Sequence, residues 1–476
     1  MATLEREVKL RGDLDLLARL DGRPLEERRF TSTYYDTADY RLARSGVTLR
    51  RRIERGKSVW QLKVPRGSAR VELELPGGPA GPPERMRKLL LGLLRGRELA
   101  AVARLRTVRR GLRMAANGRA SADVLLDEVA ILDGRKVTET FSDLEVEVVD
   151  GDEHTLEDVE RELRKAGARR GDPRPKVLRA LGLDPQAALP AVRPDASPVE
   201  HLQARLERLH EQLLAHDPGT RLGDDPEDLH QLRVATRRLR ALLRAARPML
   251  VREWSEPLRA ELDWLGDVLG PARDLDVLIE HVRKEAEDLP PEDRRALARA
   301  VVTLEAEREA ARAAVLEALT SERYLELLSA VERAARAPHV VSLDTSLHDL
   351  AAREFRRLRR AARDLRPEPG DDELHRLRIK GKRARYAAEL AEDAVGKPAA
   401  RFVERAKRFQ DVIGDHQDAA VADQRLRELR GSVRGASAAF VLGRLVERQH
   451  VRRLRARAQV PRTWKKLERS GRKAWS

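Results

Sequence analysis

The spacing of apolar residues changes once along the chain, and this change constrains the fold more than any other feature of the sequence. Residues 1–150 alternate apolar and polar side chains in short segments separated by Gly and Pro, which is typical of β-strands. Prolines follow at positions 185, 190, 194 and 198, and beyond them apolar residues recur at helical spacing over long charged segments. We therefore predict an α+β multidomain protein with a β-rich domain over 1–185, a linker over 186–198, an all-α domain over 199–460 and a basic C-terminal tail over 461–476.

The composition limits the partners and the compartment. The chain has 476 residues and a net charge of +16, so we expect an anionic partner. Aromatic residues make up only 3% of the chain, which argues against a nucleic-acid partner, because proteins that bind single strands stack bases on aromatic rings. Cysteine is absent, which excludes disulfides and fits a cytoplasmic location. No signal peptide and no run of about eighteen apolar residues is present, so we expect no membrane span.

Charged residues occupy alternate positions in several predicted strands. A strand sends every second side chain to one face, so Glu5, Glu7 and Lys9 share a face. The same alternation occurs in three later segments, at Arg50 and Arg52, at Glu72 and Glu74, and at Glu145 and Glu147. Periodicity alone fits either an antiparallel sheet with its charges in solvent or a barrel with a charged interior. A charged interior would offer carboxylates to metal ions and cations to phosphate oxygens.

The order and spacing of these residues resemble the CYTH, or triphosphate tunnel metalloenzyme, family. The motifs that carry the resemblance are Glu5-x-Glu7-x-Lys9, Thr33-Tyr-Tyr-Asp-Thr37, Leu42-x5-Thr48-Leu-Arg50-x-Arg52 and Leu62-Lys63-x-Pro65. The resemblance covers residues 1–185 and implies an eight-stranded antiparallel β-barrel tunnel with its charged faces inward. It also implies hydrolysis of inorganic triphosphate, or more rarely cyclisation of ATP, with Mg²⁺ or Mn²⁺ as the cofactor.

The resemblance also assigns roles to individual residues. The carboxylates that hold the metal would be Glu5, Glu7, Glu145 and Glu147. The residues that clasp phosphates or complete the tunnel wall would be Lys9, Arg50, Arg52, Lys63, Glu74, Arg106, Asp127 and Lys176, with Glu72 as a further candidate. Arg104 has the same strand parity as Arg106 and stays an alternative to it. Every charged position of the family pattern is filled, which argues against an inactive barrel.

The helical half contains an internal duplication. Residues 229–240 align with 374–385, and residues 265–274 align with 409–418, at offsets of 145 and 144 residues. Two matched segments at nearly one offset indicate a duplicated helical unit with a pseudo-two-fold axis. Each copy carries one basic helical stripe, formed by His230, Arg233, Arg237, Arg240 and Arg244 in the first copy and by His375, Arg378, Lys382 and Arg385 in the second. A solvated helix face usually mixes both charge signs, so we interpret these stripes as anion-binding.

These segments resemble the CHAD domain, a helical module that often follows a CYTH domain. The resemblance covers about residues 197–460 and implies two pseudo-symmetric four-helix bundles around a basic groove that binds long-chain inorganic polyphosphate. Together the two resemblances predict an inorganic triphosphatase joined to a polyphosphate-binding module that could tether it to polyphosphate granules. The alternatives are a non-enzymatic polyphosphate-binding protein with a vestigial barrel and a nucleic-acid binder. Tripolyphosphate, thiamine triphosphate and ATP all remain candidate substrates.

Overall fold

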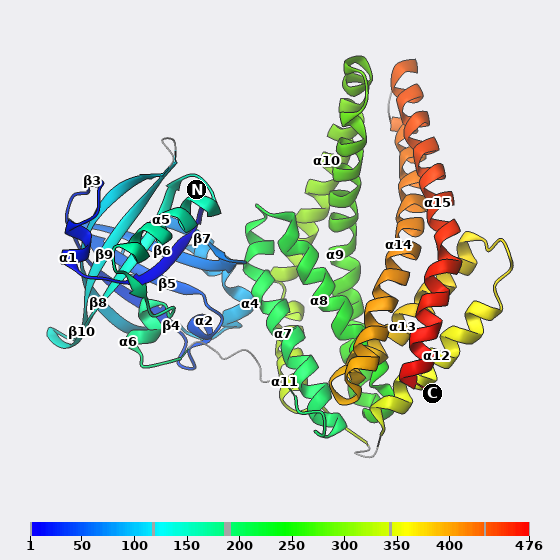
Figure 1. Cartoon of the computed structure of the whole chain (residues 1–476), viewed down its shortest axis with the longest axis horizontal. Coiled ribbons are helices and arrows are strands. Elements are labelled where there is room, and N and C mark those ends of the chain that lie inside the picture. Colours follow the sequence, from blue (N-terminus) through cyan, green and yellow to red (C-terminus); the bar gives the residue numbers. More distant parts are fainter. Residues whose placement is uncertain (1, 117–119, 185–191, 342–344, 433–434, 476) are drawn as a thin grey trace. The chain divides into compact units, whose positions relative to one another are not determined.

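The computed structural model describes residues 2–116, 120–184, 192–341, 345–432 and 435–475 (Figure 1). The chain divides into two compact units, residues 1–188 and residues 189–476. The first unit contains the β-sheet and the second contains the long helices. Residues 186–191 of the predicted linker lie outside the described residues. No helix among the described residues combines the length and the apolarity needed to cross a lipid bilayer.

The first unit is built on one sheet with the strand order β1-β7-β6-β5-β4-β8-β9-β10-β2-β11, and β3 pairs with β8 beside this path. All the described strand pairs are antiparallel. The strands are β1 Ala2–Glu5, β2 Glu7–Arg11, β3 Arg23–Pro24, β4 Arg28–Asp36, β5 Thr48–Glu54, β6 Lys57–Arg66, β7 Ala69–Pro76, β8 Ala100–Ala116, β9 Ala120–Asp133, β10 Lys136–Asp150 and β11 Arg169–Arg170. The helices of this unit are α1 Leu14–Ala18, α2 Arg41–Arg44, α3 Glu84–Leu89, α4 Leu91–Leu94, α5 Glu153–Lys165 and α6 Lys176–Ala180.

The predicted eight-stranded closed barrel is wrong in two respects. The described sheet has eleven strands, and no ladder among the described residues closes it, because β1 pairs with β7 whereas β2 pairs with β10 and β11. The physical reason is a break in the first extended segment at Arg6, between β1 and β2. The two parts of this segment pair with strands far apart in the ladder, so distant parts of the sheet meet at consecutive residues of the chain.

The apolar face of the sheet packs against helices. Val159 and Leu163 of α5 belong to the same buried cluster as Leu10, Leu144 and Val146 of strands β2 and β10. These five side chains are each at most 2% exposed. Because successive residues of a strand point to opposite faces, covering the apolar positions with α5 leaves the alternate charged positions to face the other side of the sheet.

The second unit consists of long helices (Figure 1). Their bounds are α7 Pro198–Leu222, α8 Pro226–Ala245, α9 Arg252–Glu287, α10 Pro291–Thr320, α11 Glu322–Arg336, α12 Leu347–Arg363, α13 Asp371–Val395, α14 Lys397–Ser432 and α15 Ala436–Trp475, with a short 3-10 helix at Arg247–Met249. The duplicated segments lie on α8 and α9 in the first copy and on α13 and α14 in the second. Apolar residues of both copies share one buried core. The division into two four-helix bundles stays a prediction.

The prediction of a basic tail over 461–476 is wrong, because α15 continues to Trp475. Leu467 is fully buried and Trp475 is only 4% exposed. The Trp475 ring lies 5.6 Å from the ring of Phe402 in α14. The prediction followed the cations Lys465 and Lys466, whereas the apolar residues between and after the cations continue at helical spacing and pack this end of the helix onto α14.

Candidate functional site

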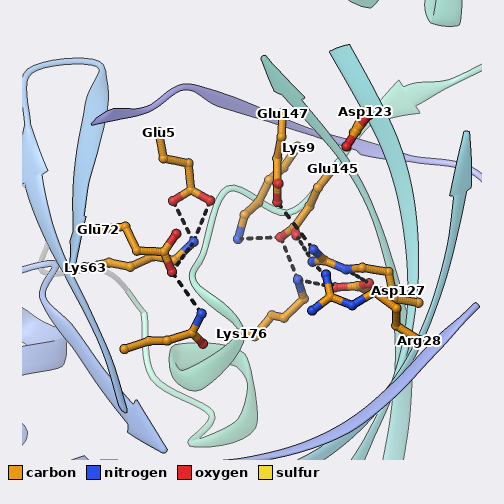
Figure 2. Close-up of polar contacts among 12 residues, drawn as sticks. Glu5, Lys9, Arg28, Lys63, Glu72, Asp123, Asp127, Glu145, Glu147 and Lys176 are labelled. Atoms are coloured by element: carbon orange, nitrogen blue, oxygen red, sulfur yellow. Dashed lines mark hydrogen bonds and ion pairs between the residues drawn. The ribbon is translucent and has the colours of Figure 1, made fainter. Parts of the chain in front are cut away.

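The charged rows of the sheet converge on one cavity of about 640 Å³. Its lining includes residues of β1 and β2, which pair with opposite parts of the ladder, so the sheet surrounds the cavity. Figure 2 shows Lys63 beside Glu5 and, across the cavity, Lys176 beside Glu145. The predicted residues that line the cavity are Glu5, Glu7, Lys9, Arg50, Arg52, Lys63, Glu74, Glu145, Glu147 and Lys176, together with the candidate Glu72.

Three carboxylates form a group that could hold a metal ion. Glu5, Glu7 and Glu147 each offer one carboxylate oxygen, and these oxygens lie within 4.8 Å of one another. Glu5 ends β1 and Glu7 begins β2, and Glu147 of β10 is the register partner of Glu7. Carboxylate oxygens are the ligands that Mg²⁺ and Mn²⁺ prefer in proteins. The donor set therefore fits the predicted cofactor, and we call Glu5, Glu7 and Glu147 the carboxylate triad.

Glu145, the fourth predicted metal ligand, binds protein cations instead. Its carboxylate accepts hydrogen bonds from Lys176 at 2.6 Å and from Arg109 at 3.0 Å. The same two cations hold Asp127, because Arg109 binds both of its oxygens at 2.7 and 2.8 Å and Lys176 lies 2.8 Å away. Burial alone would raise the pKa of both carboxyls, but the attraction of Lys176 and the other nearby cations outweighs it and lowers both pKa values. These four groups form a charge-balanced network in the wall.

Glu147 has the opposite electrostatic environment. Burial raises the pKa of its carboxyl to about 7, the nearby guanidinium of Arg109 opposes the shift, and the charges of Glu145 and Glu5 add to it. The distance between the Arg109 and Glu147 side chains is 3.6 Å. Burial likewise raises the pKa of Glu72, although Lys63 opposes that shift. Arg109 therefore does not fully offset the burial of Glu147, and a cation bound at the triad would supply further positive charge there.

We expect Glu147→Gln to stabilise the metal-free protein at neutral and alkaline pH. The folded state holds the Glu147 proton up to a pKa of about 7, against an ordinary value of 4.5, so wild-type stability falls as pH rises between these values. Glutamine cannot ionise, so the variant should gain up to about 3 kcal/mol of unfolding free energy above pH 7 and nothing below pH 4.5. Urea unfolding of both proteins in chelator at pH 4.5 and pH 8 measures the difference. An equal difference at both pH values would contradict the assignment.

Arg50 is the cation that is best placed to receive a phosphate group. It has no ion pair among the described residues, and it donates to two uncharged groups, Oε1 of Gln61 at 2.8 Å and the Tyr34 hydroxyl at 3.0 Å. Lys63 instead donates to both carboxylate oxygens of Glu5 at 2.6 Å. Arg52 is paired less closely than Lys63, because its nearest carboxylates, those of Glu74 and Glu54, are 3.6 and 3.7 Å away. An entering anion can therefore replace neutral partners of Arg50 without breaking an ion pair.

The prediction for Arg106 is wrong in position, because Arg106 is exposed and Arg109 lines the cavity in its place. In β8, Arg104 and Arg106 point outward, whereas the buried Thr107 marks the inward parity that Arg109 shares. Arg109 is also the register partner of Asp127 in β9. Buried residues of β8 occur at both odd and even positions, so no local signal in the sequence singled out Arg109, and the pairing with β9 was needed to find it.

The cavity lining also includes residues that were not identified as site residues from the sequence, among them Arg28 and Gln61. Arg28 of β4 is the register partner of Arg109 and binds Glu54 through two hydrogen bonds of 2.8 and 2.7 Å. Gln61 of β6 accepts from Arg50 and donates to Glu72 at 3.1 Å. Neither residue belongs to a segment in which charged residues occupy alternate positions, so only the sheet register places them at the site.

The basic stripes of α8 and α13 meet at a second cavity, of about 670 Å³. The predicted residues that line it are Arg237, Arg240, Arg244 and Lys382. Cations that the sequence analysis did not single out join them, namely Arg247, Arg259, Arg353, Arg357 and Arg383. Burial and the positive charges of Arg378 and Arg237 lower the pKa of Lys382 to about 7. The two stripes therefore repel one another, and an anion between them would relieve that repulsion.

The other predicted residues of the stripes do not line this cavity. Four of them have neighbouring side chains as partners, namely Arg273 for His230, Asp274 for Arg233, Gln417 for His375 and Glu389 for Arg385. Burial lowers the pKa of Arg378, and the charge of Asp418 opposes this shift. Four of the nine predicted stripe residues therefore belong to the cluster that could hold an anion, and its other cations were not predicted.

Comparison with known proteins identifies both halves of the chain. Residues 3–180 match the CYTH domain family, and residues 204–427 match the CHAD domain family. An uncharacterised protein of Mycobacterium tuberculosis strain H37Rv is 31% identical over 490 residues, which cover 96% of this chain and 93% of the relative. The chain belongs to the CYTH–CHAD family. The cavity in the sheet lies within the CYTH match and the basic cavity lies within the CHAD match.

Solved structures that resemble this CYTH–CHAD protein cover part of it. The CHAD domain of the plant Ricinus communis is 28% identical, covers 60% of this chain and 95% of its own, and has a TM-score of 0.46. PptA from Streptomyces chartreusis is 21% identical, covers 57% of this chain and 100% of its own, and also has a TM-score of 0.46. Helix α15, at Ala436–Trp475, lies beyond the residues that match the CHAD family.

Proposed function

We propose that the cavity in the sheet hydrolyses inorganic triphosphate with the help of Mg²⁺ or Mn²⁺. The observation that supports this proposal is that the carboxylate triad and several cations, among them Arg50, Arg52 and Lys63, line one cavity. Hydrolysis of a phosphoanhydride needs mainly positioning and charge neutralisation, so no nucleophilic side chain is required. The site contains both carboxylates and cations, and among the described residues the guanidinium of Arg50 donates hydrogen bonds only to uncharged groups.

The acidic and basic residues of the site would have different roles. A metal ion bound at the triad would neutralise phosphate charge and acidify a bound water. Arg50 and Arg52 would bind the phosphate oxygens, with Lys63 and Lys9 lining the same cavity. The wall network of Glu145, Asp127, Lys176 and Arg109 would keep its own charges paired and hold the cavity open. A triphosphate bound by these cations would be held in a fixed orientation with its charge partly neutralised, which are the main requirements for in-line attack by water.

Phosphate release tests this function directly. We expect the full-length protein to release phosphate from tripolyphosphate in the presence of Mg²⁺ and to stop when a chelator is added. Thiamine triphosphate and ATP should be compared under the same conditions, and product analysis would reveal cyclisation of ATP. If none of the three substrates is turned over with Mg²⁺ or Mn²⁺, the alternative of a non-enzymatic polyphosphate-binding protein replaces this proposal.

We propose further that the basic cavity of the helical unit binds long-chain inorganic polyphosphate. Cations of α8, α12 and α13 line it, and neither Arg237 nor Lys382 has an ion pair among the described residues. Such unpaired cations suit a ligand with many phosphate charges. In the cytoplasm, this binding would concentrate substrate near the cavity in the sheet or tether the protein to polyphosphate granules.

Replacing Arg237 and Lys382 with alanine should weaken polyphosphate binding about tenfold or more, because both cations line the cavity and neither has an ion pair among the described residues. Isothermal titration with long-chain polyphosphate measures the affinity. Arg294→Ala with Arg295→Ala is the matched control, since both side chains are exposed on α10 and line neither cavity. Equal losses in the two double variants would show that the net charge, rather than this cavity, sets the affinity. Duplex DNA that competes as well as polyphosphate would favour the nucleic-acid alternative.

A further inference from the structure

A third cavity, of about 650 Å³, lies between the beginning of α14 and the end of α15. Neither α8 nor α13 contributes to its lining. Its cations are Arg401 and Arg405 of α14 and five residues of α15 that begin at Arg462 and end at Lys473. All five α15 cations fall in the segment 461–476, which had been predicted to form a basic tail. The α15 part of this cavity also lies outside the match with the CHAD family.

Aromatic contacts between the two helices fix the geometry of this cavity. The rings of Phe402 and Trp475 lie 5.6 Å apart, and those of Phe409 and Trp464 lie 5.7 Å apart. These two contacts set an antiparallel register in which the start of α14 faces the end of α15, and the helices pack side by side (Figure 1). The cations recur at steps of three or four residues and therefore share one helix face. These packed aromatic contacts therefore position the cations of both helices around one cavity.

The charges around this cavity are not balanced by protein groups. None of its seven cations has an ion pair among the described residues. Its one acidic lining residue, Glu404, binds Arg408 outside the cavity at 2.6 Å. Arg472, on the same part of α15, shows the usual arrangement, with Glu468 as its partner at 2.8 Å. Like charges that converge without counter-charges repel one another, and a bound anion removes that repulsion.

We infer that this cavity is a second polyanion site, which binds a linear chain of phosphate groups. Arg462 and Lys473 are separated by about 16 Å along α15, at about 1.5 Å per residue, so the cations cover successive turns of the helix. A single phosphate would reach only part of this row, whereas a chain with a charge on every unit matches it. The lining contains no aromatic or aliphatic side chain, so it offers neither a base-stacking platform nor an apolar anchor for a membrane. Base-free inorganic polyphosphate fits this chemistry best.

Binding of short-chain inorganic polyphosphate to the full-length protein tests the inference, and it does not require the sheet to be catalytic. Isothermal titration should find two chains bound per protein. The triple variant Lys465→Ala, Lys466→Ala, Arg469→Ala should lose one of them, with at least about tenfold weaker binding at this site. Arg237→Ala with Lys382→Ala should lose the other chain, and the combined variant should lose both. All three α15 side chains are exposed, so their replacement leaves the aromatic packing between α14 and α15 intact.

A matched control removes the same number of charges elsewhere in the helical unit. Lys284, Arg294 and Arg295 are exposed, have no ion pair among the described residues and line none of the three cavities. Their replacement by alanine should leave both binding events in place. The independent pair Arg401→Ala and Arg405→Ala, on the α14 side, should reproduce the loss seen with the α15 variant.

Three outcomes would overturn the inference. Equal weakening by the control variant would show that only net charge matters. Loss of all polyphosphate binding in the Arg237→Ala, Lys382→Ala variant would leave no second site. Single-stranded DNA of equal charge that binds the α14–α15 cavity as tightly as polyphosphate would assign it to nucleic acid instead. The titrations also separate the two proposals. If the wild type shows a single binding event and only the α15 variant removes it, this site is supported and the proposed polyphosphate binding at the cavity of α8 and α13 is contradicted.

Discussion

Replacing Glu5 with glutamine is expected to lower metal-dependent phosphate release from tripolyphosphate by about 10²–10³-fold. Glu5 supplies one of the three carboxylate oxygens that lie within 4.8 Å of one another, and it is also the counter-charge of Lys63 at 2.6 Å. Glutamine keeps the volume and one acceptor oxygen but removes the negative charge, so a divalent ion is held more weakly. The concentration of Mg²⁺ that gives half of the maximal rate should therefore rise together with the loss of turnover.

A matched replacement on the outer face of the same sheet controls for the loss of a carboxylate. Glu128 of β9 is exposed and pairs with Arg110 at 2.7 Å, so Glu128→Gln should keep the wild-type rate and the wild-type dependence on Mg²⁺. If Glu5→Gln behaves as this control does, the carboxylate triad is not the metal site.

Glu145→Gln distinguishes a three-carboxylate site from the four-carboxylate site that the sequence predicted. Glu145 lies 2.6 Å from Lys176 and 3.0 Å from Arg109, and it is not part of the triad. Its replacement should lower the rate by disturbing these cations while leaving the Mg²⁺ dependence unchanged. A shift in the Mg²⁺ dependence as large as that of Glu5→Gln would restore Glu145 to the metal ligands.

The sequence predicted the charged rows of the sheet because strand parity has a fixed period of two. Once Glu5, Glu7 and Lys9 belong to one extended segment, their shared face follows from the backbone alone. Periodicity left open which face meets solvent, because both faces of an isolated strand are equivalent until another element covers one of them. Packing of Val159 and Leu163 of α5 on the apolar face decides the question, and it needs residues about 150 positions away from the first strand.

Strand register and long-range pairing are what the sequence could not provide. Strand β8 runs from Ala100 to Ala116, and nothing local indicates which of its arginines lies opposite Asp127. The register selects Arg109, so the prediction of Arg106 failed. The role of Glu145 depends in the same way on Lys176, which α6 brings to it from 31 residues further along the chain. The sequence shows which charged residues each strand carries, whereas the partners of these residues required the fold.

Asp127→Asn is expected to destabilise the sheet by about 3–5 kcal/mol, which is the typical cost of removing the charge of one partner in a buried ion pair. Asp127 is only 1% exposed, and it is bound by Arg109 through two hydrogen bonds and by Lys176 at 2.8 Å. Asparagine would leave two buried cations with Glu145 as their main remaining counter-charge. Hydrogen exchange of the β8 and β9 amides should therefore accelerate markedly, because it reports the opening of this part of the sheet.

Asp123→Asn provides the matched comparison, because it removes the acid of another Arg–Asp pair between the same two strands. Asp123 binds both Nε and Nη2 of Arg113, at 2.6 and 2.9 Å, with nearly the same geometry as the pair of Arg109 and Asp127. The Arg113 side chain is 43% exposed, against 13% for Arg109, so water can solvate the cation that loses its partner. The expected cost is below about 1 kcal/mol, with little change in exchange. Equal losses in the two variants would mean that the geometry of the pair, rather than its burial, sets the stability of this sheet.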